Sequence, residues 1–427
     1  MSRTEYKLGI IGFGTVGEGV YHSVQERAER LEELLGKRLT VPAVLVKDGE
    51  KSRSTGPETK VVTLLKDLLA EKPDAVVEAT PDAETGYPYV RELLKMGITV
   101  VTANKELLAK KGEELEEIAG EHQAELLCEA AVAGGIPLLN TLRHTLKTNE
   151  ILQVNGILNG TSNYVLTRMR TEGTTFGKAL EEAQEKGYAE AVPDKDVDGW
   201  DASYKSTILS RWIFGQEPEW ESAEPEGIRT VTAEDLSLAE HAGGRVKHVA
   251  SLKNEQNRIT AAVRPCFVFG DHPLYAVEDV NNGVHIEGSL AGDVLLQGPG
   301  AGKYPTASAV VEDVVNVLNG RHEKLVQNRL VNREKDEGGG ADEEQFILLT
   351  GSEGLSRHLS VNGFSVTGKL HEPGWNREGV VVKAKPADIT GFKKQYREAI
   401  GIYPVLADGK QVLHYFEQRK QTRAASF

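Results

Sequence analysis

The chain has 427 residues, of which 39% are hydrophobic, so we expect two or three domains, each with its own hydrophobic core. Its formal net charge of −14 leaves no basic excess with which to bind nucleic acid or an anionic membrane. Two cysteines are too few for a disulfide framework or a thiolate zinc site, and no segment predicts a signal peptide or a membrane span. We therefore expect a cytoplasmic protein.

Short apolar runs alternate with longer amphipathic stretches through the first 133 residues. This alternation predicts a parallel sheet covered by helices. The expected strands are residues 8–11, 41–46, 75–78, 98–102 and 125–128. The stretches 18–35 and 106–119 carry apolar residues at three- and four-residue spacing and are the expected covering helices.

A second domain of mixed α+β structure is expected at residues 134–303. Its expected strands are residues 151–158, 259–263 and 294–297, and its expected helices are residues 175–186 and 200–213. Residues 304–333 include a helix at 308–318 that we expect to return to the first domain. The charged residues and three glycines of segment 334–344 indicate a linker.

A small third module is expected at residues 345–427. Its elements are predicted as strand, helix, strand, strand, helix and strand at residues 346–349, 353–359, 364–370, 380–383, 390–400 and 411–416. This βαββαβ order is that of ferredoxin-like modules, many of which bind effectors.

A glycine-rich turn, Gly12-Phe13-Gly14-Thr15-Val16-Gly17, follows the first expected strand. In the G-x-G-x-x-G pattern, the glycines allow a tight turn, close approach of a pyrophosphate, and close packing of helix on strand. The N–H groups at the helix N-terminus then bind the phosphates. Such a turn is often only a turn, but five strand–helix units around it predict a doubly wound, Rossmann-type domain that binds a dinucleotide.

The loop after the second expected strand indicates whether NAD or NADP binds. An acidic residue there selects the ribose 2′-hydroxyl of NAD, whereas a basic residue accommodates the 2′-phosphate of NADP. Lys47 comes first, followed by Asp48, Lys51 and Arg53. This order favours NADP, bound through Lys47 and Arg53, with NAD also used. The alternative is a solvated surface loop.

Two lysines, Lys105 and Lys205, are candidate catalytic residues by their positions in the expected elements. Lys105 ends the segment Thr102-Ala103-Asn104-Lys105, at the edge of the sheet where ligands bind, although an ordinary helix-start lysine is the alternative. Asp201 and Lys205 are four residues apart and share one face of the helix expected at 200–213.

Residues 183–205 resemble the signature of homoserine dehydrogenases, which reads Gly-Tyr-Ala-Glu, a Pro- and Asp-rich loop, and Asp-x-x-Gly-x-Asp-x-x-x-Lys. The residues in register are Gly187, Glu190, Asp196, Asp201 and Lys205. The likeness extends through residues 12–17, 102–105, 129–137, 156–161, 300–302 and 305–309, and covers about residues 7–320. Val192 departs from the pattern, because relatives often carry an acidic or polar residue there.

The resemblance implies the reaction L-homoserine + NAD(P)⁺ ⇌ L-aspartate 4-semialdehyde + NAD(P)H, in threonine, methionine and isoleucine biosynthesis. Oxidation of an alcohol requires a base that takes the hydroxyl proton, and the reverse reaction requires the same group as an acid. By the resemblance, Lys205 is this proton donor and acceptor, and Lys105 is a second catalytic lysine.

The resemblance also implies a substrate site. Glu190 would pair with the substrate's α-ammonium group, and Asp201 would bind the substrate or orient the catalytic lysine. Asp196 would do similar work, or simply cap the following helix. Gly160 and Thr161 complete the implied substrate site.

Further cofactor contacts and a cation site follow from the same resemblance. The implied cofactor-binding residues beyond the glycine turn are Thr80, Lys105, Gly187 and Gly302. A structural sodium ion is implied at Glu129, Val132, Gly134 and Ile136, largely through backbone carbonyls, because hard oxygen ligands suit an alkali cation. A glycine-containing loop that joins domains without an ion is the alternative.

Family likeness also implies a homodimer and an ACT-like C-terminal module, in a monofunctional enzyme. The turn at residues 351–355 departs from the ligand-binding motif of such modules, so threonine feedback is only a hypothesis. Two other functions stay open: a different Rossmann-type reductase of a small oxo-acid, and a non-catalytic nicotinamide-dependent sensor. The sensor would predict loss of one or both lysines, and both are present.

Overall fold

The computed structural model describes residues 5–222, 224–255, 258–320, 345–370, 376–395 and 400–406. The chain divides into two compact units. The first comprises Met1–Glu150, Tyr204–Glu217 and Leu296–Asn328, and the second comprises Ile151–Ser203, Pro218–Leu295 and Arg329–Phe427. The domain boundaries expected from the sequence stay predictions.

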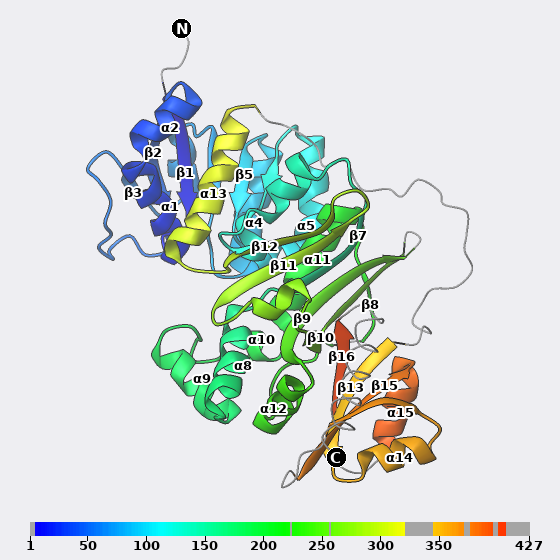
Figure 1. The fold of residues 1–427 in the computed structure, drawn as a ribbon. Coiled ribbons are helices and arrows are strands. Elements are labelled where there is room, and N and C mark those ends of the chain that lie inside the picture. Colours follow the sequence, from blue (N-terminus) through cyan, green and yellow to red (C-terminus); the bar gives the residue numbers. More distant parts are fainter. Residues whose placement is uncertain are drawn as a thin grey trace. The chain divides into compact units, whose positions relative to one another are not determined.

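A six-stranded parallel sheet forms the centre of the first unit, in the order β3-β2-β1-β4-β5-β6 (Figure 1). Its strands are β1 Glu5–Ile11, β2 Arg38–Leu45, β3 Lys60–Val62, β4 Ala75–Glu78, β5 Thr99–Thr102 and β6 Leu126–Leu127. The strand order reverses between β1 and β4, which is the switch point where dinucleotides bind in such sheets. The Rossmann-type fold is confirmed, with β3 as an additional strand too short for its pattern to stand out.

The helices of this unit are α1 Thr15–Glu26, α2 Ala28–Leu35, α3 Leu65–Ala70, α4 Ala83–Lys95, α5 Lys105–Glu121, α6 Ala130–Ala133, α7 Leu138–Asn140, the π-helical turn η1 Thr141–Thr145, and α13 Lys303–Leu318. The single helix expected at residues 18–35 is wrong, because the structure forms α1 and α2. Arg27 separates them with φ −108° and ψ 16°, outside the helical region. Apolar residues keep helical spacing on both sides of the break, so periodicity could not reveal it.

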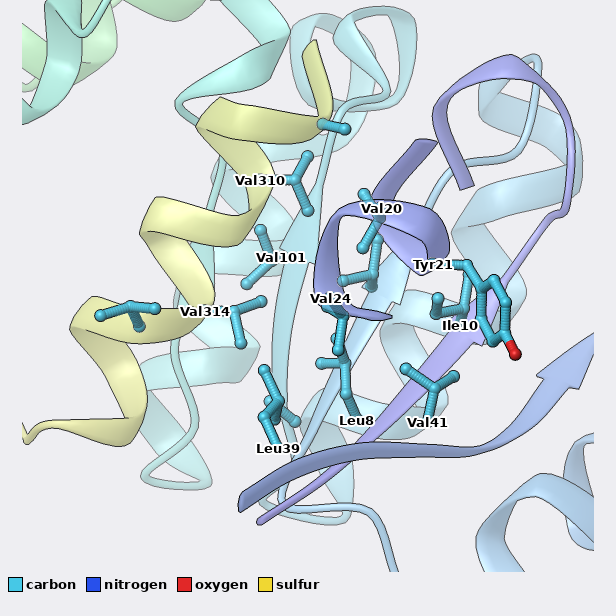
Figure 2. Packing of buried hydrophobic residues seen from close by; sticks show 14 of the residues in the cluster. Leu8, Ile10, Val20, Tyr21, Val24, Leu39, Val41, Val101, Val310 and Val314 are labelled. Atoms are coloured by element: carbon cyan, nitrogen blue, oxygen red, sulfur yellow. The ribbon is translucent and has the colours of Figure 1, made fainter. Parts of the chain in front are cut away.

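Helix α13 packs on the nucleotide sheet although it is distant in sequence. Figure 2 shows Val310 and Val314 of α13 facing Val20 and Val24 of α1, in the same core as Leu8 of β1. These side chains are at most 1% exposed, and each buried valine or leucine contributes about 1.5–3 kcal/mol. The helix expected at residues 308–318 therefore forms part of the first unit's core.

The second unit is built on a mixed sheet in the order β12-β11-β7-β9-β10-β16-β13-β15-β14, with β8 paired to β10. Its first strands are β7 Ile151–Ile157, β8 Glu219–Trp220, β9 Gly244–Glu255, β10 Arg258–Phe269, β11 Asn281–Gly288 and β12 Gly292–Pro299. The helices are α8 Gly160–Glu172, α9 Phe176–Glu185, α10 Asp194–Val197, α11 Trp200–Phe214, α12 Ala233–His241 and the 3₁₀ turn η2 Pro273–Ala276. Helix α11 begins in this unit and continues in the first.

The described C-terminal elements have the order βαββαβ, with Gly401–Leu406 as a last strand that was not expected. They are β13 Gln345–Ser352, α14 Leu355–Val361, β14 Ser365–Leu370, β15 Arg377–Ala384, α15 Pro386–Gln395 and β16 Gly401–Leu406, with the strands ordered β16-β13-β15-β14. The helix expected at 390–400 begins earlier, at Pro386. The linker at 334–344 and the strand expected at 411–416 lie outside the described residues.

Candidate active site

The glycine-rich turn has the geometry that dinucleotide binding requires. Gly12 has φ +88°, and a Cβ atom there would lie 2.5 Å from the carbonyl oxygen of Ala79. A Cβ on Gly17 would lie 2.0 Å from the carbonyl oxygen of Gly12, so α1 approaches the end of β1 too closely for any side chain. At Gly14 the space is open, since nothing lies within 4 Å of the Cβ position. The open glycine at the N-terminus of α1 leaves room for a pyrophosphate.

A buried carboxylate organises the ends of the two neighbouring strands. Glu78, the last residue of β4, is fully buried and accepts hydrogen bonds from the backbone N–H of Thr80 (2.8 Å) and the hydroxyls of Thr80 and Thr102, the latter at 2.5 Å. Burial raises the pKa of Glu78. Asn104 also contacts Thr80 and caps α5 by accepting from Leu107 N (3.0 Å). This network fixes the start of α5.

Lys105 is the first residue of α5 and is partly buried. Lys205 lies on α11 and is 6% exposed. Arg211, two turns further along α11, donates from Nη1 to Leu108 O (2.6 Å) and from Nη2 to Ala109 O (2.8 Å). The structure thus ties together the two helices that carry the predicted catalytic lysines.

Glu129 lies at the N-terminus of α6 and is 2% exposed. Its carboxylate accepts from Leu139 N (2.8 Å) and Asn140 N (2.6 Å), while its own N–H donates to Asp313 of α13 (2.9 Å). Burial, together with the negative charge of Asp313, raises the pKa of Glu129 to about 7. The other residues of the predicted cation site, Val132, Gly134 and Ile136, are buried in the same segment.

In the second unit, two of the predicted substrate-binding carboxylates meet at one amide group. Asn159 donates from Nδ2 to Asp196 Oδ1 (2.8 Å) and to Asp201 Oδ2 (2.9 Å). Asp201 is 2% exposed, in the first turn of α11. Thr161 is 7% exposed and donates to Tyr188 O (2.6 Å). Asp196, Asp201 and the start of α8 therefore form one polar cluster.

Other predicted residues lie outside that cluster's contacts. Glu190 is exposed in the loop between α9 and α10, where Gln184 Nε2 donates to its backbone oxygen (3.0 Å). Gly187 is exposed in the same loop with φ +73°. Lys47 is exposed after β2, and Arg53 donates to Lys51 O (2.6 Å) within that loop. Gly302 precedes α13 in the first unit.

The family model described as "Homoserine dehydrogenase" matches residues 137–315, and the model described as "Homoserine dehydrogenase, NAD binding domain" matches residues 12–129. A homoserine dehydrogenase of Lactococcus lactis is 40% identical over 333 residues, which are 77% of this chain and 75% of that protein. The chain belongs to the homoserine dehydrogenase family.

Solved structures agree with that assignment. The crystal structure of a homoserine dehydrogenase from Thiobacillus denitrificans has a TM-score of 0.82 and 29% identity, and the match covers 94% of this chain and 98% of that one. A hyperthermophilic archaeal homoserine dehydrogenase in complex with NADPH has a TM-score of 0.64 and 30% identity, covering 75% of this chain and 99% of that one.

As a homoserine dehydrogenase, the chain is an NAD(P)-dependent oxidoreductase that acts on a CH–OH group. Family membership decides between this function and the two alternatives, a reductase of another oxo-acid and a non-catalytic sensor. In the described part of the chain, no helix is long and apolar enough to cross a membrane.

The sequence did not predict several residues that hydrogen-bond to the elements or side chains of this homoserine dehydrogenase's candidate site. Glu78 ends an apolar run, and a charged residue there was the available signal. Asp313 has apolar neighbours in α13, and Arg211 lies among mixed residues of α11, so neither stands out locally. Asn159 belongs to a quoted motif, but its two aspartate partners lie 37 and 42 residues away.

Proposed function

We propose that Lys205 is the proton donor and acceptor of the homoserine dehydrogenase reaction and that Lys105 is a second catalytic lysine. The observation that carries this proposal is the buried pair Asp201 and Lys205, one turn apart on α11, on a helix that Arg211 ties to α5. Bound nicotinamide supplies the hydride acceptor for alcohol oxidation. The lysine amine then takes the hydroxyl proton, and its ammonium form returns that proton in the reverse reaction.

For substrate binding, we propose that Glu190 pairs with the α-ammonium group of homoserine. Asp201 binds the substrate or orients Lys205, and Asp196, Gly160 and Thr161 contribute at the start of α8. Supporting this assignment, Asn159 brings the carboxylates of Asp196 and Asp201 together. Opposite charges and charge-assisted hydrogen bonds make such carboxylates suitable partners for an ammonium group.

For the cofactor, we propose NADP as the preferred dinucleotide, with NAD also used. The glycine turn of residues 12–17 would hold the pyrophosphate, and Thr80, Lys105, Gly187 and Gly302 would complete the site. Lys47 is exposed at the end of β2, where it is accessible to a 2′-phosphate, and Asp48 already accepts from Glu50 N (2.9 Å). Initial rates with L-homoserine and each of NADP⁺ and NAD⁺ measure the preference.

We also propose a structural sodium ion at Glu129, Val132, Gly134 and Ile136. The buried residues fit a cation, because Glu129 and Asp313 together place two carboxyl groups of raised pKa in one buried region. A monovalent cation would offset the excess negative charge there. We further propose that the protein is a cytoplasmic homodimer, and sedimentation equilibrium tests the dimer by its mass. We also propose that threonine inhibits the enzyme, and activity measured across millimolar threonine tests this feedback.

The catalytic assignment is tested by Lys205→Met. We expect kcat to fall by about 10²- to 10⁴-fold, the usual contribution of a positioned proton-transfer group, while NADPH binding stays unchanged. Lys110→Met is the matched control, because Lys110 is exposed on α5 and its ammonium pairs with Glu106 at 2.6 Å. Its turnover should stay within about twofold of the parent. Near-parental turnover of Lys205→Met would show that Lys205 is not the proton donor and acceptor.

A further inference from the structure

Asn159 lies between β7 and α8 and is not itself among the residues proposed above to bind the substrate or the cofactor. It is the residue before α8, with extended backbone (φ −123°, ψ 114°), and it is 6% exposed. Its side-chain oxygen accepts from Ser162 N (2.8 Å), which caps α8. Its side-chain nitrogen donates to Asp196 Oδ1 (2.8 Å) and Asp201 Oδ2 (2.9 Å).

The chemistry of these three hydrogen bonds leaves one orientation for the amide. Carboxylates accept hydrogen bonds, so the NH₂ group must face the aspartates and the oxygen must face the N–H of the helix. An NH₂ group has two hydrogens, and each serves one carboxylate. No other side chain of similar size both caps a helix and donates two hydrogen bonds in this way.

The two aspartates come from different elements. Asp196 lies on the four-residue helix α10, and Asp201 lies in the first turn of α11. Ser162 also binds this region, since its hydroxyl donates to Asp196 O (2.9 Å). Two like charges on one donor group repel each other, and proximity favours protonation of one of them. The amide between them opposes both effects.

We infer that Asn159 is a positioning residue of the substrate site, which holds the carboxylates of Asp196 and Asp201 at a fixed separation and in their ionised form. This inference rests on the proposed substrate-binding role of those two aspartates. Asn159 acts through them: it orients Asp201 one turn ahead of Lys205 and ties both carboxylates to the N-terminus of α8. The substrate's polar groups then meet a prearranged pair of acceptors.

Other charged and titratable groups near Asp196 and Asp201 contribute to the pH dependence of activity. His248 of β9 interacts electrostatically with Asp201, and burial lowers its pKa, so it is neutral near pH 7. Lys205 lies on the same helix as Asp201, and Arg229 pairs with Asp194 and Asp198 on either side of Asp196. Loss of Asn159 removes one hydrogen-bond donor from each carboxylate, so the repulsion between the two aspartates should increase.

Three substitutions separate positioning from simple helix capping. Asn159→Ser and Asn159→Asp both keep an N-cap acceptor, whereas Asn159→Ala removes it. Of these four residue types at position 159, only asparagine can donate hydrogen bonds to both carboxylates. A capping role therefore predicts that Ala is the worst replacement, while a positioning role predicts that Asp is the worst, because it places a third carboxylate beside the other two.

The experiment measures kcat/KM for L-homoserine from pH 5.5 to 9, with NADPH affinity and thermal stability as folding controls. We expect Asn159→Ser to lose about 10- to 100-fold in kcat/KM, mainly through KM, and its acid limb to move up by about one pH unit. Asn159→Asp should lose more, and NADPH affinity should not change. Parental kinetics and pH profile in Asn159→Ser would overturn the inference, even if Asn159→Asp fails to fold.

The aspartates provide the comparison that separates this inference from the proposed function. If Asp201→Asn and Asp196→Asn raise KM for L-homoserine but Asn159→Ser does not, the substrate site stands and the positioning role is wrong. If the aspartate variants also leave KM unchanged, the proposed substrate site is wrong and the inference falls with it.

Discussion

Glu129 and Asp313 are two buried carboxyl groups of raised pKa beside the predicted cation site. Burial and the charge of Asp313 raise the pKa of Glu129 to about 7, and burial raises the pKa of Asp313 to about 6. Two backbone N–H groups donate to Glu129 and lower its pKa, but they do not offset burial. The folded chain therefore holds protons here that the unfolded chain releases.

This pair predicts a pH-dependent stability. Below about pH 4 the two carboxyl groups are protonated in both the folded and the unfolded chain, so burial costs no ionisation energy. Above the raised pKa values both groups must be ionised in the folded chain, and the full cost of burying their charges applies. The free energy of unfolding should fall as pH rises from 4.5 to 7, by about 3 kcal/mol for Glu129 alone. Urea denaturation from pH 4.5 to 8 in sodium-free buffer measures the fall.

Two controls accompany that measurement. Glu129→Gln should make the curve less steep, because it removes one of the two charges that become costly at high pH, while burial still raises the pKa of Asp313. Sodium chloride should restore stability at pH 8 more than choline chloride of equal ionic strength does. A flat curve for the parent chain would show that the buried pair is not strained, and equal effects of the two salts would count against a sodium ion.

At the scale of elements, helix α8 is held on its sheet by a partly buried ionic network. Lys247 of β9 is 2% exposed and donates to Val277 O (2.5 Å) and Glu278 Oε1 (2.7 Å). Glu278 also accepts from Arg170 of α8 (2.9 Å) and from Arg245 (2.7 Å). Burial lowers the pKa of Lys247 to about 8, and although burial opposes it, Lys247 and Arg170 lower the pKa of Glu278 to about 2. The glutamate is the common partner of three cations.

Replacement of Glu278 should therefore cost more than loss of one ion pair. Glu278→Gln leaves the buried Lys247 without its counter-charge and removes a partner from the partly buried Arg170 and Arg245. We therefore expect a loss of about 3–5 kcal/mol in the free energy of unfolding, measured with urea at pH 7. Glu240→Gln is the control, because Glu240 binds the same Arg170 (3.0 Å) but is 48% exposed. It should cost under about 1 kcal/mol. Equal losses in the two variants would contradict this account.

At the scale of the whole molecule, the C-terminal module belongs to the second unit's sheet and core. Strand β16 pairs in parallel with β10 through Phe267↔Val405 and Val268↔Leu406. Leu348, Leu370 and Val381 of the module join the hydrophobic cluster that contains Leu236 and Leu238 of α12. The buried carboxylate of Asp235 binds Arg377 (2.9 Å) and Tyr403 Oη (2.9 Å). Such a module should unfold together with the elements it packs on.

Asp235→Ala tests this continuity. The substitution removes the partner of Arg377 and the capping-box carboxylate of α12, so we expect the Tm of the second unit to fall by several degrees in one cooperative calorimetric transition. Val361→Ala is the control, because Val361 belongs to the same module but is 80% exposed. A separate, earlier transition of the module alone would show that it is independent.

Local rules were enough to predict much of this enzyme from its sequence. The glycine turn, the strand–helix alternation and the shared face of Asp201 and Lys205 all depend on residues within a few positions of one another, where backbone sterics and periodicity act directly. The break at Arg27 was missed because periodicity continues across it. Sequence likeness then identified the reaction, because the signature residues are also close in sequence.

Contacts between distant segments were decided only by the tertiary structure. Nothing near Asn159 in the sequence reveals Asp201, and Glu129 meets Asp313 across 184 residues. The return of α13 onto α1 depends likewise on complementary apolar faces that come together only when the chain folds. Periodicity tells which face of an element is buried but not its partner, because the same apolar face can pack against many others. Which buried polar groups meet is therefore settled by packing of the whole fold.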